Sequence, residues 1–126
     1  MLHFTEEQVW ALLEKYKVTP PVPYRLGWGR SSCMTCIFNS PKIWSTISTY
    51  YPERAQLIAG YEQKFDCTIS RSKIDVVSLS NRIEPFDIQD MEALVQSKIE
   101  SYYLPVFTDN WTVPPGAFNK EGCGSL

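Results

Sequence analysis

The chain has 126 residues, a formal net charge of -2 and a hydrophobic fraction of 44%. This composition excludes a disordered chain, and the length predicts a single domain, 1-126, built around one core. The charge disfavours nucleic-acid binding, and no apolar run approaches the roughly 20 residues of a membrane span. Four cysteines behind a start that does not resemble a signal peptide predict a cytoplasmic protein with thiols rather than disulfides.

The first predicted element is a helix over about 6–17. Thr5 and Gln8 have the spacing of a capping box, and apolar residues then recur at i, i+4 and i+7. The proline-rich segment 19–23 ends this helix, because proline removes a donor and restricts the residue before it. The following stretch, 24–39, is predicted to be a loop rich in glycine, arginine and cysteine.

Two more helices are predicted from proline and its neighbours. Ser40 before Pro41 indicates an N-cap with a first-turn proline, and Pro52 indicates a second helix start. The first of these helices is expected to bury Ile43, Trp44, Ile47 and Tyr51. The second is expected to bury Leu57, Ile58, Tyr61 and Phe65, and to leave Glu62 solvated.

The rest of the chain is predicted to contain one further helix and a tail. Segment 74–77 is compatible with a short strand, although no partner strand is evident. Asp87 is expected to cap a helix that buries Ile88, Met91, Val95 and Ile99. The prediction is a mostly α fold of about four helices over 5–103, with an irregular tail over 104–126 that wraps the helical core.

Cys33-x-x-Cys36 is the motif with the most possible chemical roles, in metal binding or in redox reactions. The spacing is half of a tetrahedral zinc or iron–sulfur site, or that of a redox pair. The other candidate ligands are His3, Cys67 and Cys123, and none stands at an adjacent motif spacing. The structural alternative is two small residues that pack the loop onto the helices.

A second candidate site is an oxyanion cradle in the same loop. Guanidinium groups match sulfate and phosphate oxygens, and hydroxyls and loop amides add donors. The predicted substrate-binding residues are Arg25, Arg30, Ser31 and Ser32. Arg71 with Lys73 forms another local basic pair that could bind a small anion. The alternative is that these cations are simply solvated.

Other catalytic schemes find little support. His3 is the only histidine and lies near a terminus, so serine and cysteine hydrolase schemes lack their base. No glycine-rich phosphate loop of the P-loop or dinucleotide type is present.

Several blocks of this sequence resemble a known family. They are Thr5-Glu6-Glu7-x-Val9-Trp10, Pro21 to Tyr24, Gly27-x-Gly29-Arg30-x-x-Cys33-x-x-Cys36, Tyr51-Pro52-Glu53, Tyr61-Glu62 and Trp111-x-x-Pro114-x-Gly116-Ala117-Phe118. Together they resemble the C-terminal part of the phosphoadenosine phosphosulfate (PAPS) reductase family, closest to its phage and mobile-element members.

The resemblance implies a lid-like helical region over the nucleotide site of a PAPS-reductase-like protein. The family's pyrophosphate loop, S-G-G-K-D-S, has no counterpart here, so the nucleotide-binding half is expected either to lie in another chain or to have been lost by truncation. Arg25, Arg30, Cys33 and Cys36 map to the lid over the sulfate or phosphate end of the nucleotide. The family's terminal E-C-G-L-H is replaced by the sequence from Glu121 to Leu126, with Cys123 after an inserted glycine and no histidine. We therefore expect a chain that is inactive alone; the alternatives are a small zinc or iron–sulfur module and an interaction protein of a mobile element.

Overall fold

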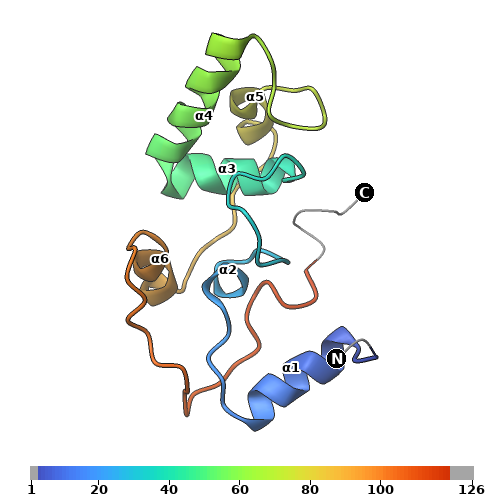
Figure 1. Cartoon of the computed structure of the whole chain (residues 1–126), viewed down its shortest axis with the longest axis vertical. Coiled ribbons are helices and arrows are strands. Elements are labelled where there is room, and N and C mark those ends of the chain that lie inside the picture. The colour runs from blue at the N-terminus through green and yellow to red at the C-terminus, as the bar shows by residue number, and fades with distance from the viewer. Residues whose placement is uncertain (1–2, 120–126) are drawn as a thin grey trace. The chain divides into compact units, whose positions relative to one another are not determined.

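The structure is a computed structural model, and it describes residues 3–119 (Figure 1). Over this range the chain forms six helices, which confirms a mostly α fold. They are α1 (Glu6–Lys15), α2 (Val22–Arg25), α3 (Pro41–Tyr50), α4 (Pro52–Phe65), α5 (Val76–Ser80) and α6 (Met91–Ser97). None of the helices in this range is long and apolar enough to cross a membrane.

The chain divides into two compact units. Unit 1 contains residues 3–31 and Ile88–Asn119, and therefore α1, α2 and α6. Unit 2 contains residues 32–87, and therefore α3, α4 and α5. The sequence predicted a single domain, and this stays a prediction; each unit is described below by itself.

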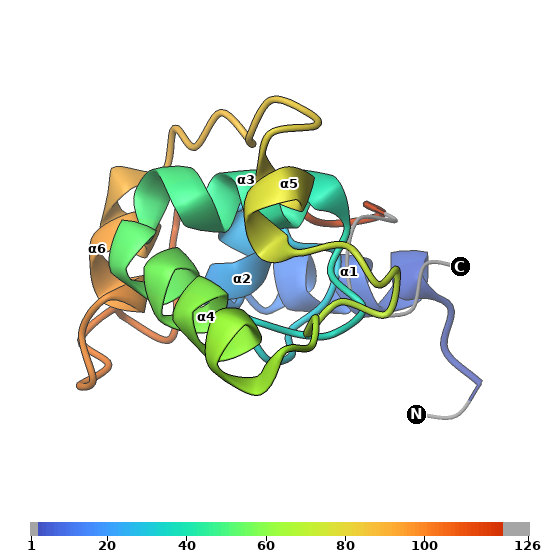
Figure 2. The same cartoon turned by 90° about the horizontal axis from the view of Figure 1, so that it is seen from above.

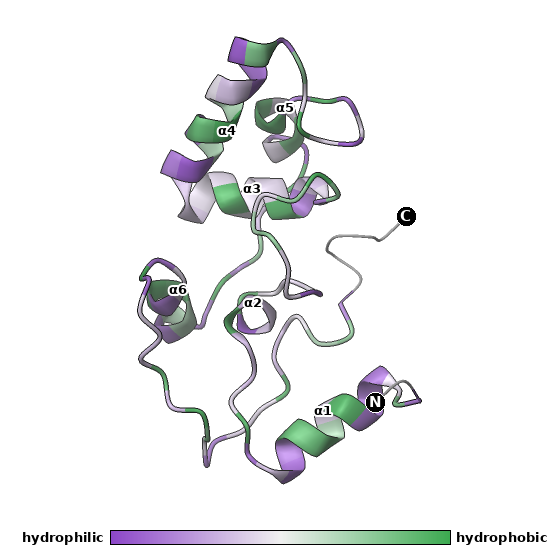
Figure 3. Cartoon of the chain, viewed as in Figure 1, coloured by the Kyte–Doolittle hydropathy of each residue, from purple (hydrophilic) through white to green (hydrophobic). Residues whose placement is uncertain are grey.

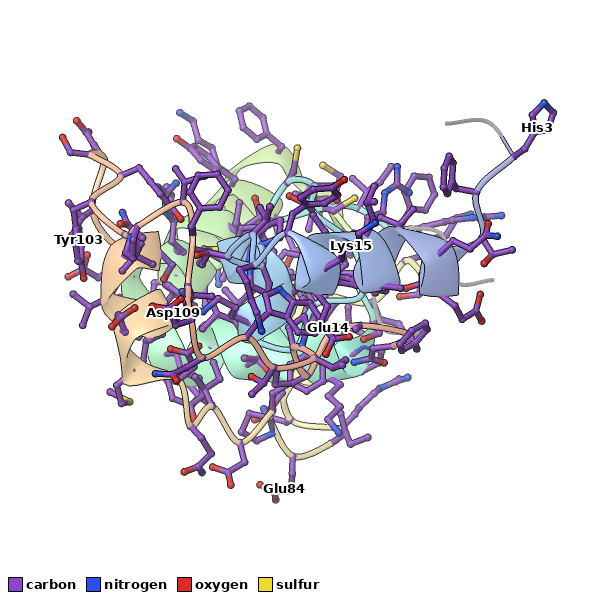
Figure 4. All side chains as sticks on the ribbon, turned by 90° about the horizontal axis from the view of Figure 1, so that it is seen from below. His3, Glu14, Lys15, Glu84, Tyr103 and Asp109 are labelled. Carbon is purple, nitrogen blue, oxygen red and sulfur yellow. The ribbon has the colours of Figure 1, made fainter. Side chains whose placement is uncertain are left out.

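In unit 1, local signals place α1 as predicted. The Thr5 hydroxyl accepts from the Gln8 amide at 3.3 Å, and the Gln8 side chain accepts from the Thr5 amide at 2.9 Å, so the capping box is confirmed. The helix ends at Lys15, because Lys17 has a left-handed backbone with φ of 56°. Figure 4 shows His3 projecting beyond the start of this helix.

The proline segment that was predicted as a turn and loop forms the short helix α2. Pro23 lies in its first turn, where the missing N–H costs no hydrogen bond. The ring of Tyr24 meets the buried Trp10 edge to face, with centroids 5.0 Å apart. The core of unit 1 also contains Leu26, Trp28, Ile88, Leu94, Leu104 and Trp111.

Over its described residues, 104–119, the tail is irregular and packed. It returns along residues 17–28, where the Thr19 amide donates to Val106 O at 2.8 Å and the Trp111 indole N–H donates to Val18 O at 2.8 Å. The Gly116 amide donates to Tyr24 O at 2.7 Å. The prediction of a packed, irregular tail is confirmed for 104–119, and Cys123 with its flanking motif lies outside the described residues.

Helix α6 begins later than predicted, and a different face is buried. Its N-cap is Asp90 rather than Asp87, and the buried helical residues are Ala93, Leu94 and Gln96. Of the predicted stripe, Ile88 is buried but precedes the helix, whereas Met91, Val95 and Ile99 are exposed. The reason is tertiary: α6 packs on α2, and Asp90 is bound to Arg25 on that helix.

Unit 2 is a three-helix cluster in which α3 packs against α4 and α5 (Figure 2). Ser40 caps α3, with its hydroxyl accepting from the Ile43 amide at 3.4 Å, as predicted. The predicted α3 stripe is also confirmed, since Ile43, Trp44, Ile47 and Tyr51 are buried. The ambiguous segment 74–77 is not a strand: Asp75 caps α5 by accepting from the Ser78 amide at 2.9 Å.

The buried face of α4 differs from the prediction. Leu57, Tyr61 and Phe65 are 49%, 47% and 63% exposed and Ile58 is half-buried, whereas Glu62 is buried at 9%. The Glu62 carboxylate accepts from the Ile69 amide at 2.9 Å and the Val76 amide at 3.0 Å. These bonds compensate the desolvation of the carboxylate. The face of α4 that carries Glu62 is buried, and most of the apolar stripe lies at the surface. In Figure 3 green, apolar segments alternate with purple, polar segments along α4.

Candidate functional site

The predicted oxyanion ligand Arg25 is engaged in a fork-shaped ion pair within unit 1. Its Nε lies 2.7 Å from Asp90 Oδ2, and its Nη2 lies 3.0 Å from Asp90 Oδ1 and 3.4 Å from Glu92 Oε1. Burial alone lowers the pKa of Arg25, but the hydrogen bonds and charges of the two carboxylates raise it above its ordinary value. The guanidinium therefore joins α2 to α6 in this structure.

A polar cavity of about 280 Å³ opens beside this ion pair. Trp111 and residues of the tail form its walls together with Arg25, Asp90 and Glu92. Two carboxylates against one guanidinium make the charged lining net negative. This cavity is therefore a poor match for a sulfate or phosphate group.

The other predicted ligands do not belong to one unit. Arg30 and Ser31 are exposed residues of unit 1, and Ser32 is an exposed residue of unit 2. The division of the chain falls between the two serines. Oxyanion binding by Arg25, Arg30, Ser31 and Ser32 stays a prediction.

The two motif cysteines lie in unit 2. Cys33 is exposed, Cys36 is half-buried, and both are present as thiols, as is the exposed Cys67. Over residues 3–119, no group of three or more histidine, cysteine or acidic side chains is arranged to hold a metal ion. The prediction of zinc or iron–sulfur at Cys33 and Cys36 is neither supported nor tested by this arrangement, because Cys123 lies outside that range.

The segment between the cysteines is a tight turn that Asn39 stabilises. Met34 and Thr35 form the turn. The buried Asn39 side-chain amide donates to Met34 O at 2.6 Å, and its backbone amide donates to Cys36 O at 3.0 Å. Asn39 thus binds the Met34 and Cys36 carbonyls of the cysteine turn. It also directly precedes Ser40, the N-cap of α3.

A cavity of about 450 Å³ lies next to this turn, entirely within unit 2. One wall is the segment that leaves the cysteine turn and enters α3. The other wall comes from the loop before α5 and from the end of α5. The lining residues are Ile37, Phe38, Asn39, Ser40, Pro41, Ser70, Arg71, Ser72, Leu79 and Arg82. We call this cavity the serine–arginine pocket.

The charged groups of the serine–arginine pocket are cationic. Arg71 and Arg82 are the charged residues among the described ones that line it, and both are exposed. The Arg71 guanidinium lies 5.6 Å from the centroid of the Phe38 ring, a cation–π arrangement that orients it. The start of α3 adds the partial positive charge of a helix N-terminus. Electrostatics in this pocket therefore favour an anion.

Hydroxyl groups complete the polar lining. Ser70 Oγ lies 2.9 Å from Ser72 Oγ and accepts from the Ser72 amide at 3.3 Å. Ser70 is buried, whereas Ser72 is exposed and can turn its hydroxyl toward a bound group. Each hydroxyl has one proton and the two are bonded to each other, so the pair leaves one directional donor to add to the two guanidinium groups.

The loop that carries Ser70 and Arg71 is held at three points. The Glu62 carboxylate accepts from the Ile69 amide on one side and from the Val76 amide on the other. The Arg71 amide donates to Ile37 O at 3.0 Å, which ties the loop to the wall beside the cysteine turn. These bonds position Arg71 without using its side chain.

Sequence reasoning found this pocket only in part. Arg71 was recognised as half of a local basic pair with Lys73, but Arg82, Ser70 and Ser72 were not singled out. The available signal was the triplet Ser70-Arg71-Ser72, in which two hydroxyls flank a guanidinium. Nothing in the sequence places Arg82 beside this triplet.

Comparisons of this chain with protein-family models, with curated proteins and with solved structures find no match.

Proposed function

We propose that unit 2 binds a sulfate or phosphate group in the serine–arginine pocket. We further propose that the chain is the lid-like C-terminal region of a PAPS-reductase-like protein whose nucleotide-binding half is supplied by another chain. The observation that carries the proposal is one cavity with two guanidinium groups, three serine hydroxyls and no acidic residue among its described lining residues.

A tetrahedral oxyanion suits this donor set. Guanidinium forks bind its oxygens through charge-assisted hydrogen bonds, each contributing roughly 1.5–3 kcal/mol. Both arginines are exposed, so screening and the loss of side-chain freedom reduce these gains. We expect a free sulfate or phosphate ion to bind with a Kd of about 1 mM, which corresponds to roughly 4 kcal/mol.

The weak affinity is consistent with a region that contributes one end of a larger ligand. In the resembling family, the segment containing Cys33 and Cys36 belongs to the lid over the sulfate or phosphate end of the nucleotide. In this chain the serine–arginine pocket begins at Ile37, directly after that segment. The adenosine end of the ligand would then be bound by the other half, and the chain alone would lack reductase activity.

Titration calorimetry with sodium sulfate, against sodium chloride at matched ionic strength, tests the anion site. Arg71→Gln and Arg82→Gln are expected to weaken sulfate binding at least fivefold each. Arg54→Gln is the matched control, because Arg54 is an exposed arginine of unit 2 outside the pocket. Equal affinity in the wild type and both pocket variants, or an equal loss in the control, would contradict a localised anion site.

A mixing experiment tests the proposed lid role separately from the anion site. The chain is added to a polypeptide that carries an S-G-G-K-D-S loop, and binding of phosphoadenosine phosphosulfate is measured for each part and for the mixture. We expect at least a tenfold higher affinity in the mixture, and a loss of that gain with Arg71→Gln. Additive binding of the two parts would refute the lid role and leave the anion site standing.

A further inference from the structure

We infer that Cys33 and Cys36 form a reversible disulfide, and that its formation reshapes the wall of the serine–arginine pocket. Three observations support this inference: the accessibility of the thiols, the turn between them, and the hydrogen bonds that join this turn to the pocket.

The oxidation state and the exposure of Cys33 and Cys36 both permit thiol–disulfide exchange. Both residues are thiols, and Cys33 is exposed while Cys36 is half-buried. Thiol–disulfide exchange requires access of one thiol to an external disulfide, followed by attack of a second thiol nearby. An exposed first cysteine and a more protected second cysteine suit these two steps.

The backbone between the cysteines also suits a bridge. Met34 and Thr35 form a turn, which places the first and fourth Cα atoms within about 7 Å. Disulfides span Cα separations of roughly 4.4–6.8 Å, so the backbone of this turn needs at most a small tightening to admit one.

The reaction is balanced by a small disulfide such as glutathione disulfide. The Cys33 sulfur attacks one sulfur of glutathione disulfide, and a first glutathione thiol leaves. The Cys36 sulfur then attacks the Cys33 sulfur, and a second glutathione thiol leaves with the remaining proton. Two protein thiols are oxidised, one S–S bond forms in the chain, and the S–S bond of glutathione disulfide is reduced to two thiols.

Asn39 couples this bond to the pocket. Its side-chain amide is bound to Met34 O, inside the loop that the disulfide closes, and its backbone amide is bound to Cys36 O. Asn39 itself lines the pocket, and its neighbour Phe38 lies under the Arg71 guanidinium. Tightening the turn reorients the Met34 and Cys36 carbonyls, so at least one Asn39 bond weakens and the wall beside Arg71 moves.

The expected consequence is a lower anion affinity in the oxidised chain. This consequence rests on the proposed function of the pocket, whereas the disulfide and the movement of the wall do not. We expect the oxidised chain to bind sulfate at least threefold more weakly than the reduced chain. We also expect the Asn39 and Arg71 amides to exchange their hydrogens faster after oxidation, since their acceptors lie on the segment that moves.

The test begins with the reduced full chain, incubated with glutathione disulfide in the presence of a chelator. Intact mass and peptide mapping are expected to show a Cys33–Cys36 bond without glutathione attached to either residue. Cys33→Ser or Cys36→Ser is expected to retain one glutathione on the remaining motif cysteine. Cys67→Ser, which removes another exposed thiol of unit 2, is expected to leave bridge formation unchanged.

Amide exchange and sulfate titration are then compared between the reduced and oxidised chains. Stable glutathione adducts on Cys33 or Cys36 of the wild type, or unchanged exchange at Asn39 and Arg71, would overturn the inference. Faster exchange with unchanged sulfate affinity would overturn the regulation of the pocket. If the reduced chain binds no sulfate, the proposed function fails, while the mass and exchange data still decide whether the bridge forms and moves the wall.

Discussion

The Glu62 carboxylate accepts a hydrogen bond from the buried Val76 amide at 3.0 Å. Its other oxygen accepts from the Ile69 amide at 2.9 Å. One side chain of α4 therefore holds both ends of the loop that carries Ser70 and Arg71. Because these donors are removed from water, the loop position depends on a carboxylate with two accepting oxygens.

Glu62→Gln is expected to destabilise the chain by about 2 kcal/mol. Glutamine keeps one accepting oxygen but presents an NH₂ group to one of the two backbone amides, which leaves that donor unsatisfied. Urea denaturation measures the change in the free energy of unfolding. Glu84→Gln is the control, since Glu84 is an exposed residue of the same unit (Figure 4). A loss equal to that of the control would show that the buried carboxylate is not needed.

The Arg25–Asp90 pair predicts a pH dependence of stability. Burial raises the pKa of Asp90, but the Arg25 hydrogen bond, the Ala93 amide and the guanidinium charge lower it below its ordinary value. A lowered folded-state pKa adds stability that is complete above the unfolded-state pKa of about 3.9 and is lost as pH falls through the folded-state pKa. We therefore expect the free energy of unfolding to decrease as the pH falls below about 4.

Asp90→Asn is expected to remove part of this acid dependence and to cost about 1–3 kcal/mol near neutral pH, because Arg25 loses its charged partner. Asp109→Asn changes the same charge at an exposed position of unit 1. Denaturation curves at several pH values measure the effect. An Asp90 variant with the stability and acid slope of the wild type would contradict a stabilising ion pair.

Substitution by alanine is expected to destabilise the chain at Gly116 and to stabilise it at Gly60. At Gly116 an added Cβ would collide with Trp28 O and lie 2.8 Å from Tyr24 O, and both are backbone atoms that move only with the chain. Gly116→Ala is therefore expected to cost at least about 2 kcal/mol. At Gly60, in the exposed part of α4, nothing lies within 4 Å of an added Cβ.

Gly60→Ala is accordingly expected to stabilise the chain by roughly 0.5–1 kcal/mol, because alanine loses less backbone freedom in a helix. The two variants are compared in one thermal and urea series. Equal effects at both positions would contradict the close approach of the tail to residues 24–28.

The starts of α1, α3 and α4 were predictable because their signals are local. The Thr5–Gln8 capping box and the Ser40 cap each lie within one turn of the helix that they begin, and each forms as predicted. Pro52 likewise begins α4 as predicted. The α3 stripe was also predictable, since the apolar residues at helical spacing are the ones that are buried in the cluster with α4 and α5.

The faces of α4 and α6 were not predictable by the same means. Both helices carry apolar residues at helical spacing, yet Leu57 and Val95 are exposed and Glu62 is buried. Periodicity indicates which residues share a face, but only the packing partners decide whether that face is covered. In α4 the two backbone amides that need an acceptor outweigh the apolar stripe, and in α6 the Arg25–Asp90 bond sets the orientation.

The sequence by itself determined the helical class, the starts of α1, α3 and α4, and a loop around the two motif cysteines, because these depend on residues within a few positions of each other. The serine–arginine pocket was decided by the tertiary structure. Phe38, Arg71 and Arg82 come from three separate segments, and they meet only because Glu62 and the Ile37 carbonyl hold the intervening loop. Long-range hydrogen bonds of this kind have no periodic signal in a single chain, so the pocket becomes visible only after the chain has folded.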